Sequence, residues 1–290
     1  MPGGIRFEQR HKGILHIIAA AFCFALMSFF VRAAGDVPSM QKCFFRNIVA
    51  LFVAAFLLMR TEEKFKIQKG SLPFLFLRAI CGSAGLICNF YAIDRMNIAD
   101  ANMLNKLSPF FAIVFSCFIL KERANKVEWS MVAIAFAGAL LVMKPSFNVE
   151  FVPALVGALG GMGAGAAYTF VRLLGKRGER GKMIVFFFSS FSTLVTLPFI
   201  LLDYHPMALW QWGMLVLAGI AAMGGQLNIT AAYTYAPAKE ISVFDYSQII
   251  FAALLGFFFL DQIPDVYSVT GYVLIIGAAV VRWRYQQKEA

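Results

Sequence analysis

Long runs of apolar residues, separated by short polar and basic stretches, follow one another along the whole chain. Each run has about the 20 residues that a helix needs to cross the hydrocarbon core of a bilayer. The pattern therefore predicts ten transmembrane helices joined by short loops. The predicted spans are residues 14–34, 40–59, 71–93, 98–120, 127–144, 151–174, 183–203, 208–235, 239–260 and 265–284. The eighth span is long enough to tilt or to break, and Gly224 and Gly225 mark the point where a break is expected.

The composition agrees with an all-α integral membrane protein. Of the 290 residues, 60% are apolar and 14% are charged, whereas soluble domains have about 45–50% and about 25%. Ten spans leave no room for a sizeable soluble catalytic domain. The sequence has no phosphate-binding loop, nucleophile elbow or zinc-protease motif, and its three histidines do not form a ligand set. We therefore expect a protein that is not an enzyme, with no catalytic residues, no metal and no cofactor.

The basic residues indicate the orientation of the chain. There are 26 Lys and Arg against 16 Asp and Glu. If the N-terminus is cytoplasmic, 19 of the 26 fall in inner segments and five fall at the outer face. Because inner loops of membrane proteins are enriched in Lys and Arg, we expect a multi-pass protein of the cell (inner) membrane with both termini in the cytoplasm. Nucleic acid is not expected as a partner, since the bases do not gather on a soluble face.

Matches at a nearly constant spacing indicate an internal repeat. The tripeptide Phe-Val-Arg occurs at residues 30–32 and again 140 residues later at 170–172. Leu120 and Leu260 end the fourth and ninth predicted spans at the same offset. Together with the ten spans, these matches predict two halves of five helices each.

Five is an odd number, so the second half must enter the membrane from the opposite side. The sequence therefore predicts an inverted repeat, a common plan among secondary transporters. The two predicted units are residues 1–145 and residues 146–290. The loop after the fourth span is basic at residues 121–123, whereas its counterpart at 261–265 has no base. That difference is expected if the two loops lie on opposite sides of the membrane.

At this point the chain resembles the drug/metabolite transporter superfamily, of the EamA type. The resemblance covers nearly the whole sequence and rests on the five-plus-five layout, on Phe-Arg-Asn at residues 45–47, and on the stretch 97–123 with Pro109 inside it. Gly138 matches a family glycine in the following helix, and in the second half Asp-Gln at 261–262 replaces the usual glutamate. The resemblance implies a secondary carrier or exporter that has a central cavity between its halves and no ATPase subunit.

Two ionisable residues fall near the middle of predicted spans, where such groups are expensive and usually functional. At about 1.5 Å per helical residue, Lys106 lies about 13 Å from the outer end of its span and Asp245 about 10 Å from the inner end of its span. They occupy nearly equivalent repeat positions, since Asn105 plus 140 is Asp245. We predict that Lys106 binds a carboxylate or phosphate of a substrate, and that Asp245 holds an amine or a proton or pairs with Lys106 when the site is empty. The alternative is a purely structural pair.

Other polar side chains within the spans complete the predicted substrate site. Neutral hydrogen bonds and aromatic walls are expected from Asn102, Tyr246, Gln248, Asn89, Tyr91, Gln226, Asn228 and Tyr233, and also from Tyr168. A polar contact between helices is the alternative for each of them. Arg78 either faces the cavity or reaches to the inner surface. Arg46 lines the outer vestibule, pairs with Asp100, or anchors the interface.

Two backbone features carry further predictions. Pro109 lacks a backbone N–H, so it is expected either to free a carbonyl toward the cavity or to kink the helix. Gly157, Gly161 and Gly165 recur every four residues, which permits close approach of a neighbouring helix. We expect this stripe to serve helix packing, with sliding during transport as the alternative.

The sequence therefore predicts a transporter of a small polar metabolite, amino-acid-like or carboxylate-bearing, that works by alternating access around a midplane cavity. A flippase for a lipid or lipid-linked intermediate, and a membrane scaffold or sensor, are the alternatives. The expected partners are a small-molecule substrate and the lipid bilayer. A coupling proton and a homodimer are left open.

Overall fold

The computed structural model describes residues 2–119, 121, 125–143, 151–235 and 242–288. The described residues form helices and connecting loops, with no strand among them, and ten stretches are long and apolar enough to cross a membrane. The helices are α1 (Pro2–Ala33), α2 (Ser39–Met59), α3 (Leu72–Arg95), α4 (Ile98–Asn105), α5 (Ser108–Ile119), α6 (Lys126–Met143), α7 (Phe151–Lys176), α8 (Gly181–Leu202), α9 (Leu209–Tyr235), the 3₁₀ helix η1 (Ser242–Tyr246), α11 (Ser247–Leu260) and α12 (Val266–Lys288). The predicted all-α fold with ten spans is confirmed.

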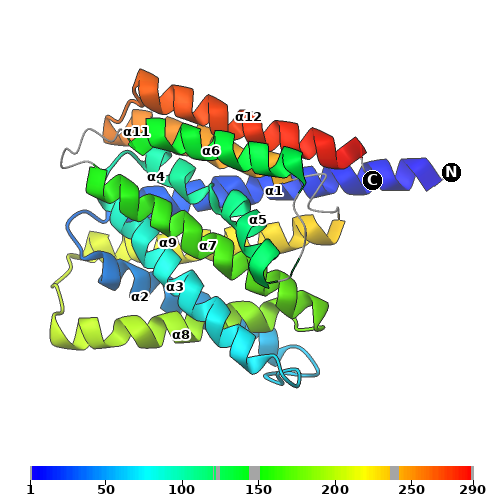
Figure 1. Cartoon of the computed structure of the whole chain (residues 1–290). Helices are drawn as coiled ribbons and strands as arrows, with labels where there is room; N and C mark the ends of the chain where they lie inside the picture. Colours follow the sequence, from blue (N-terminus) through cyan, green and yellow to red (C-terminus); the bar gives the residue numbers. More distant parts are fainter. Residues whose placement is uncertain (1, 120, 122–124, 144–150, 236–241, 289–290) are drawn as a thin grey trace.

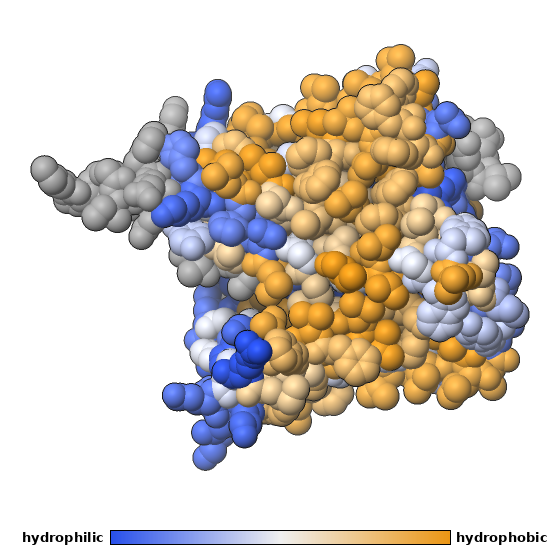
Figure 2. Space-filling model, turned by 180° about the vertical axis from the view of Figure 1, so that it is seen from behind, coloured by the Kyte–Doolittle hydropathy of each residue, from blue (hydrophilic) through white to orange (hydrophobic). Residues whose placement is uncertain are grey.

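The surface separates into an apolar belt and polar ends. Figure 2 shows the belt running across the middle of the molecule, with hydrophilic residues gathered at both ends of the helices. Large apolar side chains on this surface are widely exposed, among them Leu202, Leu209 and Phe258. A soluble protein would not leave such a surface in water, so the belt faces lipid.

The helices pack in a pattern that is preserved when the two halves are exchanged. α1 lies against α9 and α3 lies against α7, while α2 packs on α8, α6 on α12 and α4 on α11 (Figure 1). If α1 is exchanged with α7 and α3 with α9, the α1–α9 contact becomes the α3–α7 contact. The other three contacts each join a helix of the first half to the corresponding helix of the second half. This is the packing expected of two related halves. The inversion of the second half stays a prediction, and so does the boundary between residues 145 and 146, which lies outside the described residues.

Both chain ends lie at one end of the bundle, which we call the terminal end; the opposite end is the far end (Figure 1). Ten crossings are an even number, so this placement follows from the number of spans. The side of the membrane on which the terminal end lies stays a prediction.

The fourth span consists of two helices because its backbone is interrupted at mid-depth. α4 ends at Asn105 and α5 begins at Ser108. Pro109 has no N–H to donate, and the N–H of Phe110 bonds to Leu107 O at 2.9 Å rather than to the carbonyl four residues back. The ninth span is built similarly, since η1 precedes α11 there. The fourth span is therefore interrupted near its middle, where Pro109 was expected to disturb it, and the ninth span begins with a 3₁₀ turn.

The eighth span does not break, so the prediction at Gly224 and Gly225 is wrong. α9 is one continuous helix through both glycines. A Cβ built at Gly224 would lie 3.2 Å from Cys23 Sγ, and one built at Gly225 would lie 2.7 Å from the Phe24 ring. These glycines serve close packing of α9 on α1, which needs no break in the helix.

The glycine stripe of α7 also serves packing, as predicted. A Cβ at Gly161 would lie 2.5 Å from Leu104 O, and one at Gly165 would lie 2.7 Å from Ser108 O. α7 therefore presses directly on the interrupted fourth span. On another side of the same helix, a Cβ at Gly160 would lie 3.1 Å from Gly85 O of α3.

Candidate substrate-binding site

Lys106 and Asp245 form an ion pair in the interior of the bundle, between Lys106 Nζ and Asp245 Oδ2. Lys106 directly follows α4, where the fourth span is interrupted, and Asp245 belongs to η1. Their side chains are 10% and 17% exposed. The predicted pairing of the two residues is confirmed, and it links the two irregular spans.

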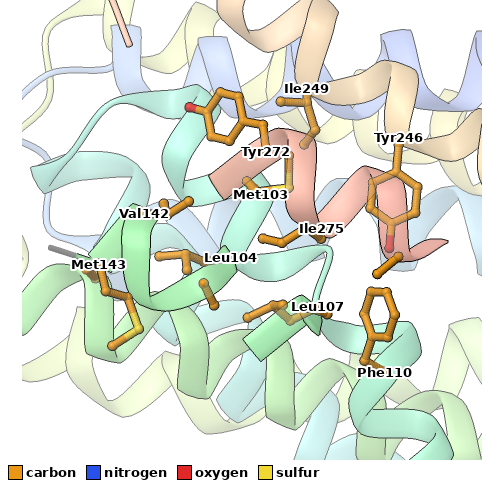
Figure 3. Close-up of a cluster of buried hydrophobic side chains, with 14 of the residues drawn as sticks. Met103, Leu104, Leu107, Phe110, Val142, Met143, Tyr246, Ile249, Tyr272 and Ile275 are labelled. Carbon is orange, nitrogen blue, oxygen red and sulfur yellow. The ribbon is translucent and has the colours of Figure 1, made fainter. Parts of the chain in front are cut away.

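A second contact joins the same two spans. The Tyr246 hydroxyl donates to Lys106 O at 3.1 Å. In a regular helix that carbonyl would accept the N–H of Phe110, which bonds instead to Leu107 O. The carbonyl that the irregular backbone frees is thus satisfied by the other half of the protein. Figure 3 shows Tyr246 across from Phe110, at the edge of a cluster of buried apolar side chains.

Beside the ion pair, Asn102 joins three spans. Its Oδ1 accepts from Gln248 Nε2 at 2.7 Å and from Ser28 Oγ at 3.0 Å. Its Nδ2 donates to Ile98 O at 2.7 Å. Both polar atoms of the Asn102 side chain are therefore engaged within the protein, so the geometry favours the interhelix alternative for Asn102 and Gln248.

Arg46 and Arg78 lie on α2 and α3, away from acidic partners. Arg46 Nη1 donates to Asn47 Oδ1 at 2.7 Å. The guanidinium of Arg78 lies over the Phe188 ring, 3.9 Å from its centre. The predicted alternative in which Arg46 pairs with Asp100 is not what the structure forms, because Asp100 Oδ1 accepts from the Tyr272 hydroxyl at 2.5 Å. Arg78 is partly exposed, with its Nε and Nη1 buried.

Tyr168 lies on α7 in the neighbourhood of these charges. Its side chain is 52% exposed. Asp245, Arg78 and Arg46, which belong to three different spans, lie near enough to influence it electrostatically.

The remaining predicted site residues lie on α3 and α9. Asn89 is 5% exposed and lies next to Gly160 of α7. Tyr91 lies under the Arg95 guanidinium, 3.8 Å away, toward the far end. Asn228 Oδ1 is 2.8 Å from His16 Nδ1, which makes it an interhelix contact. Gln226 is partly buried on α9, whereas the Tyr233 side chain lies outside the described residues. None of the contacts described for Asn89, Tyr91 and Asn228 reaches the Lys106–Asp245 pair.

A polar cluster that the sequence did not predict closes the far end. Lys42, which is fully buried, is 2.5 Å from Asp94 Oδ1 and donates to Gly35 O at 2.8 Å. Ser39 Oγ donates to Asp94 Oδ2 at 2.7 Å. Arg32 Nη1 donates to the carbonyl of Ile93 at 3.1 Å and also to that of Asp94. Lys42 lies near the start of α2, where sequence alone gives it no partner, and only the tertiary structure shows that α1, α2 and α3 come together there.

Ten apolar spans around a buried ion pair define a multi-pass membrane protein. The chain belongs to the EamA-like transporter family, whose model matches residues 11–144 and 153–283. It is a transporter and not an enzyme, and it is a member of the drug/metabolite transporter superfamily.

Several curated relatives cover most of the chain. It is 33% identical to the pseudopaline exporter CntI of Pseudomonas aeruginosa (strain UCBPP-PA14), over 93% of this chain and 95% of the exporter. It is 26% identical to solute carrier family 35 member G1 of Mus musculus, over 93% of this chain and 79% of the carrier. A crystal structure of a protein that is 16% identical superposes with a TM-score of 0.65 and covers 96% of this chain and 99% of its own. That likeness supports the fold alone.

Proposed function

We propose that this transporter moves a small polar, carboxylate-bearing metabolite by alternating access around the Lys106–Asp245 pair. Amino-acid-like molecules are included in this class. The observation that carries the proposal is the ion pair itself, which joins the two irregular spans of the bundle.

Irregular backbone inside a bilayer is tolerated where it is buried in protein or lines a cavity. Charged side chains at that depth are expensive and mark the paths of substrates. An ion pair between two spans offers a simple exchange: the carboxylate of a substrate replaces Asp245 at Lys106, and an amine or a proton compensates Asp245. Each charge stays neutralised throughout, so the exchange does not leave a bare charge inside the protein.

We propose export as the direction of transport, on the strength of the similarity to an exporter over nearly the whole chain. We also propose that transport is coupled to protons through Asp245. Asp245 Oδ1 has no hydrogen-bond partner among the described residues, so it is available to a proton or to a substrate amine.

The test is counterflow in proteoliposomes, with purified protein and a panel of amino acids and carboxylates measured by mass spectrometry. Lys106→Gln and Asp245→Asn are expected to lower the flux of any accepted solute by about tenfold or more, equivalent to at least about 1.4 kcal/mol. Lys182→Gln is the matched control, because Lys182 is exposed at the start of α8. It removes the same charge and is expected to leave the flux unchanged.

The same proteoliposomes also test the flippase alternative. A fluorescent lipid placed in one leaflet reports scrambling. If lipid crosses, no solute of the panel does, and Lys106→Gln behaves as the wild type, the proposal is wrong and the alternative gains support.

A further inference from the structure

Two arginines inside the bundle have no acidic partner. Arg46 is 8% exposed, and its one hydrogen bond goes to the neutral amide of Asn47. Its Nε is buried without a partner, as are Nε and Nη1 of Arg78. Among the described residues neither guanidinium forms an ion pair. Buried donors are normally satisfied, and an uncompensated charge within a membrane is costlier still.

Both guanidiniums are held against the same helix. Arg78 stacks on Phe188 of α8. Arg46 bonds to Asn47, whose Nδ2 donates to Ser192 Oγ of α8 at 2.9 Å. Phe188 and Ser192 lie about one turn apart, a rise of about 6 Å. Both arginines are therefore linked to the same stretch of α8. Two like charges within a membrane span are costly unless a negative group compensates them.

α8 itself carries further polar groups that lack a hydrogen-bond partner among the described residues. Ser189 Oγ and Thr193 Oγ1 of α8 are buried and have no partner in the described part of the chain. Guanidinium N–H groups and hydroxyls are donors that suit carboxylate and phosphate oxygens. Tyr168, which is 52% exposed, lies in the neighbourhood of both arginines.

The two arginines differ from Lys106 in their charge balance. Lys106 is paired with Asp245, whereas neither Arg46 nor Arg78 has a carboxylate partner among the described residues. A zwitterionic amino acid would bring no net negative charge to them. A molecule with two negative charges would balance both.

We propose that Arg46 and Arg78 form an anion subsite, separate from the Lys106–Asp245 pair, that binds a doubly charged group of the transported molecule. The group is either a pair of carboxylates or one phosphate. This inference rests on the proposed function and narrows its substrate class from polar metabolites to dianions.

The test measures thermal unfolding of the purified full chain in nanodiscs with two matched pairs of probes at equal ionic strength. Succinate is compared with succinamate, and methyl phosphate with dimethyl phosphate, at a pH where the first member of each pair is a dianion. At least one dianion is expected to raise the unfolding temperature of the wild type saturably, because a ligand stabilises the state that binds it. Its monoanionic partner is expected to have no such effect. Which pair responds distinguishes dicarboxylates from phosphates.

Arg46→Gln and Arg78→Gln are expected to abolish the response. Arg46→Lys and Arg78→Lys keep the charge and lose the two-pronged donor geometry, so an intermediate response is expected. Arg60→Gln is the matched control: Arg60 is exposed at the end of α2 over the Phe56 ring and keeps the full response. Equal responses to dianion and monoanion in the wild type, no response to either dianion, or a full response in both Gln variants each overturn the subsite.

Failure of this inference and failure of the proposed function look different. If Lys106→Gln loses flux while both Arg→Gln variants transport and bind as the wild type, the dianion subsite is wrong and the transport proposal stands. If the dianion binds through the arginines but Lys106→Gln does not affect flux, the subsite stands and the role of the ion pair is wrong.

Discussion

Lys106 and Asp245, which lie 139 residues apart in the chain, form an ion pair where the fourth and ninth spans depart from regular helix. One partner comes from each predicted half of the protein. The pair thus helps to tie the two halves together, and a movement that separates the fourth and ninth spans must stretch or break it.

Loss of one member of this pair should cost stability. Removing one partner of a fully buried pair costs about 3–5 kcal/mol, and the cost should be smaller here because the side chains are 10% and 17% exposed. Lys106→Gln and Asp245→Asn should each lower the unfolding temperature, whereas the double variant should be closer to the wild type. If the single variants are as stable as the wild type, the two charges do not depend on one another.

Tyr246→Phe should destabilise the protein by about 1–2 kcal/mol, because it leaves the freed Lys106 carbonyl without its donor. Thermal unfolding in nanodiscs measures the change. Tyr267→Phe removes a hydroxyl from an exposed tyrosine of α12 and should have no effect. Equal stability of the two variants would show that the Tyr246 hydroxyl adds nothing.

Gly161→Ala should push α7 away from the fourth span, since the new methyl would lie 2.5 Å from Leu104 O. Overpacking of this kind costs about 1–3 kcal/mol. Gly175→Ala on the same helix meets nothing within 4 Å, and should be neutral or slightly stabilising because alanine favours helix. The contrast between the two variants in an unfolding assay tests the packing role of the stripe.

Asp94→Asn should weaken the far end of the bundle, because it leaves the fully buried Lys42 without its counter-charge. A loss of about 3 kcal/mol or more is expected. Asp203→Asn, at an exposed position near the same end, should leave the unfolding temperature unchanged. A wild-type unfolding temperature for Asp94→Asn would mean that Lys42 needs no carboxylate.

Labelling with a membrane-impermeant maleimide should test the predicted orientation. In a chain whose five cysteines are replaced, Asp203→Cys should react in intact cells and Lys69→Cys only after permeabilisation. Both positions are exposed, and they lie at opposite ends of the bundle. The reverse pattern would place both termini outside the cytoplasm.

Part of the site follows from sequence alone. Lys106 and Asp245 stand out because an ionisable residue within an apolar run is rare, and the spacing of the repeat places both near the midplane. Pro109 predicts the interruption of the fourth span. The matching irregularity at η1 has no proline within it, and Asn102, an expected substrate contact, has its polar atoms bonded to other spans.

The apolar pattern by itself determined that ten helices cross a membrane, since each helix must satisfy its own backbone in lipid whatever its neighbours are. It also determined which few charges lie deep within the spans. Only the tertiary structure decided which of those charges are compensated. Lys106 pairs with Asp245, whereas Arg46 and Arg78 are both linked to α8 and neither has a carboxylate partner among the described residues. Compensation depends on which faces of distant helices meet, and helix packing through residues such as Gly161 and Gly165 sets those faces.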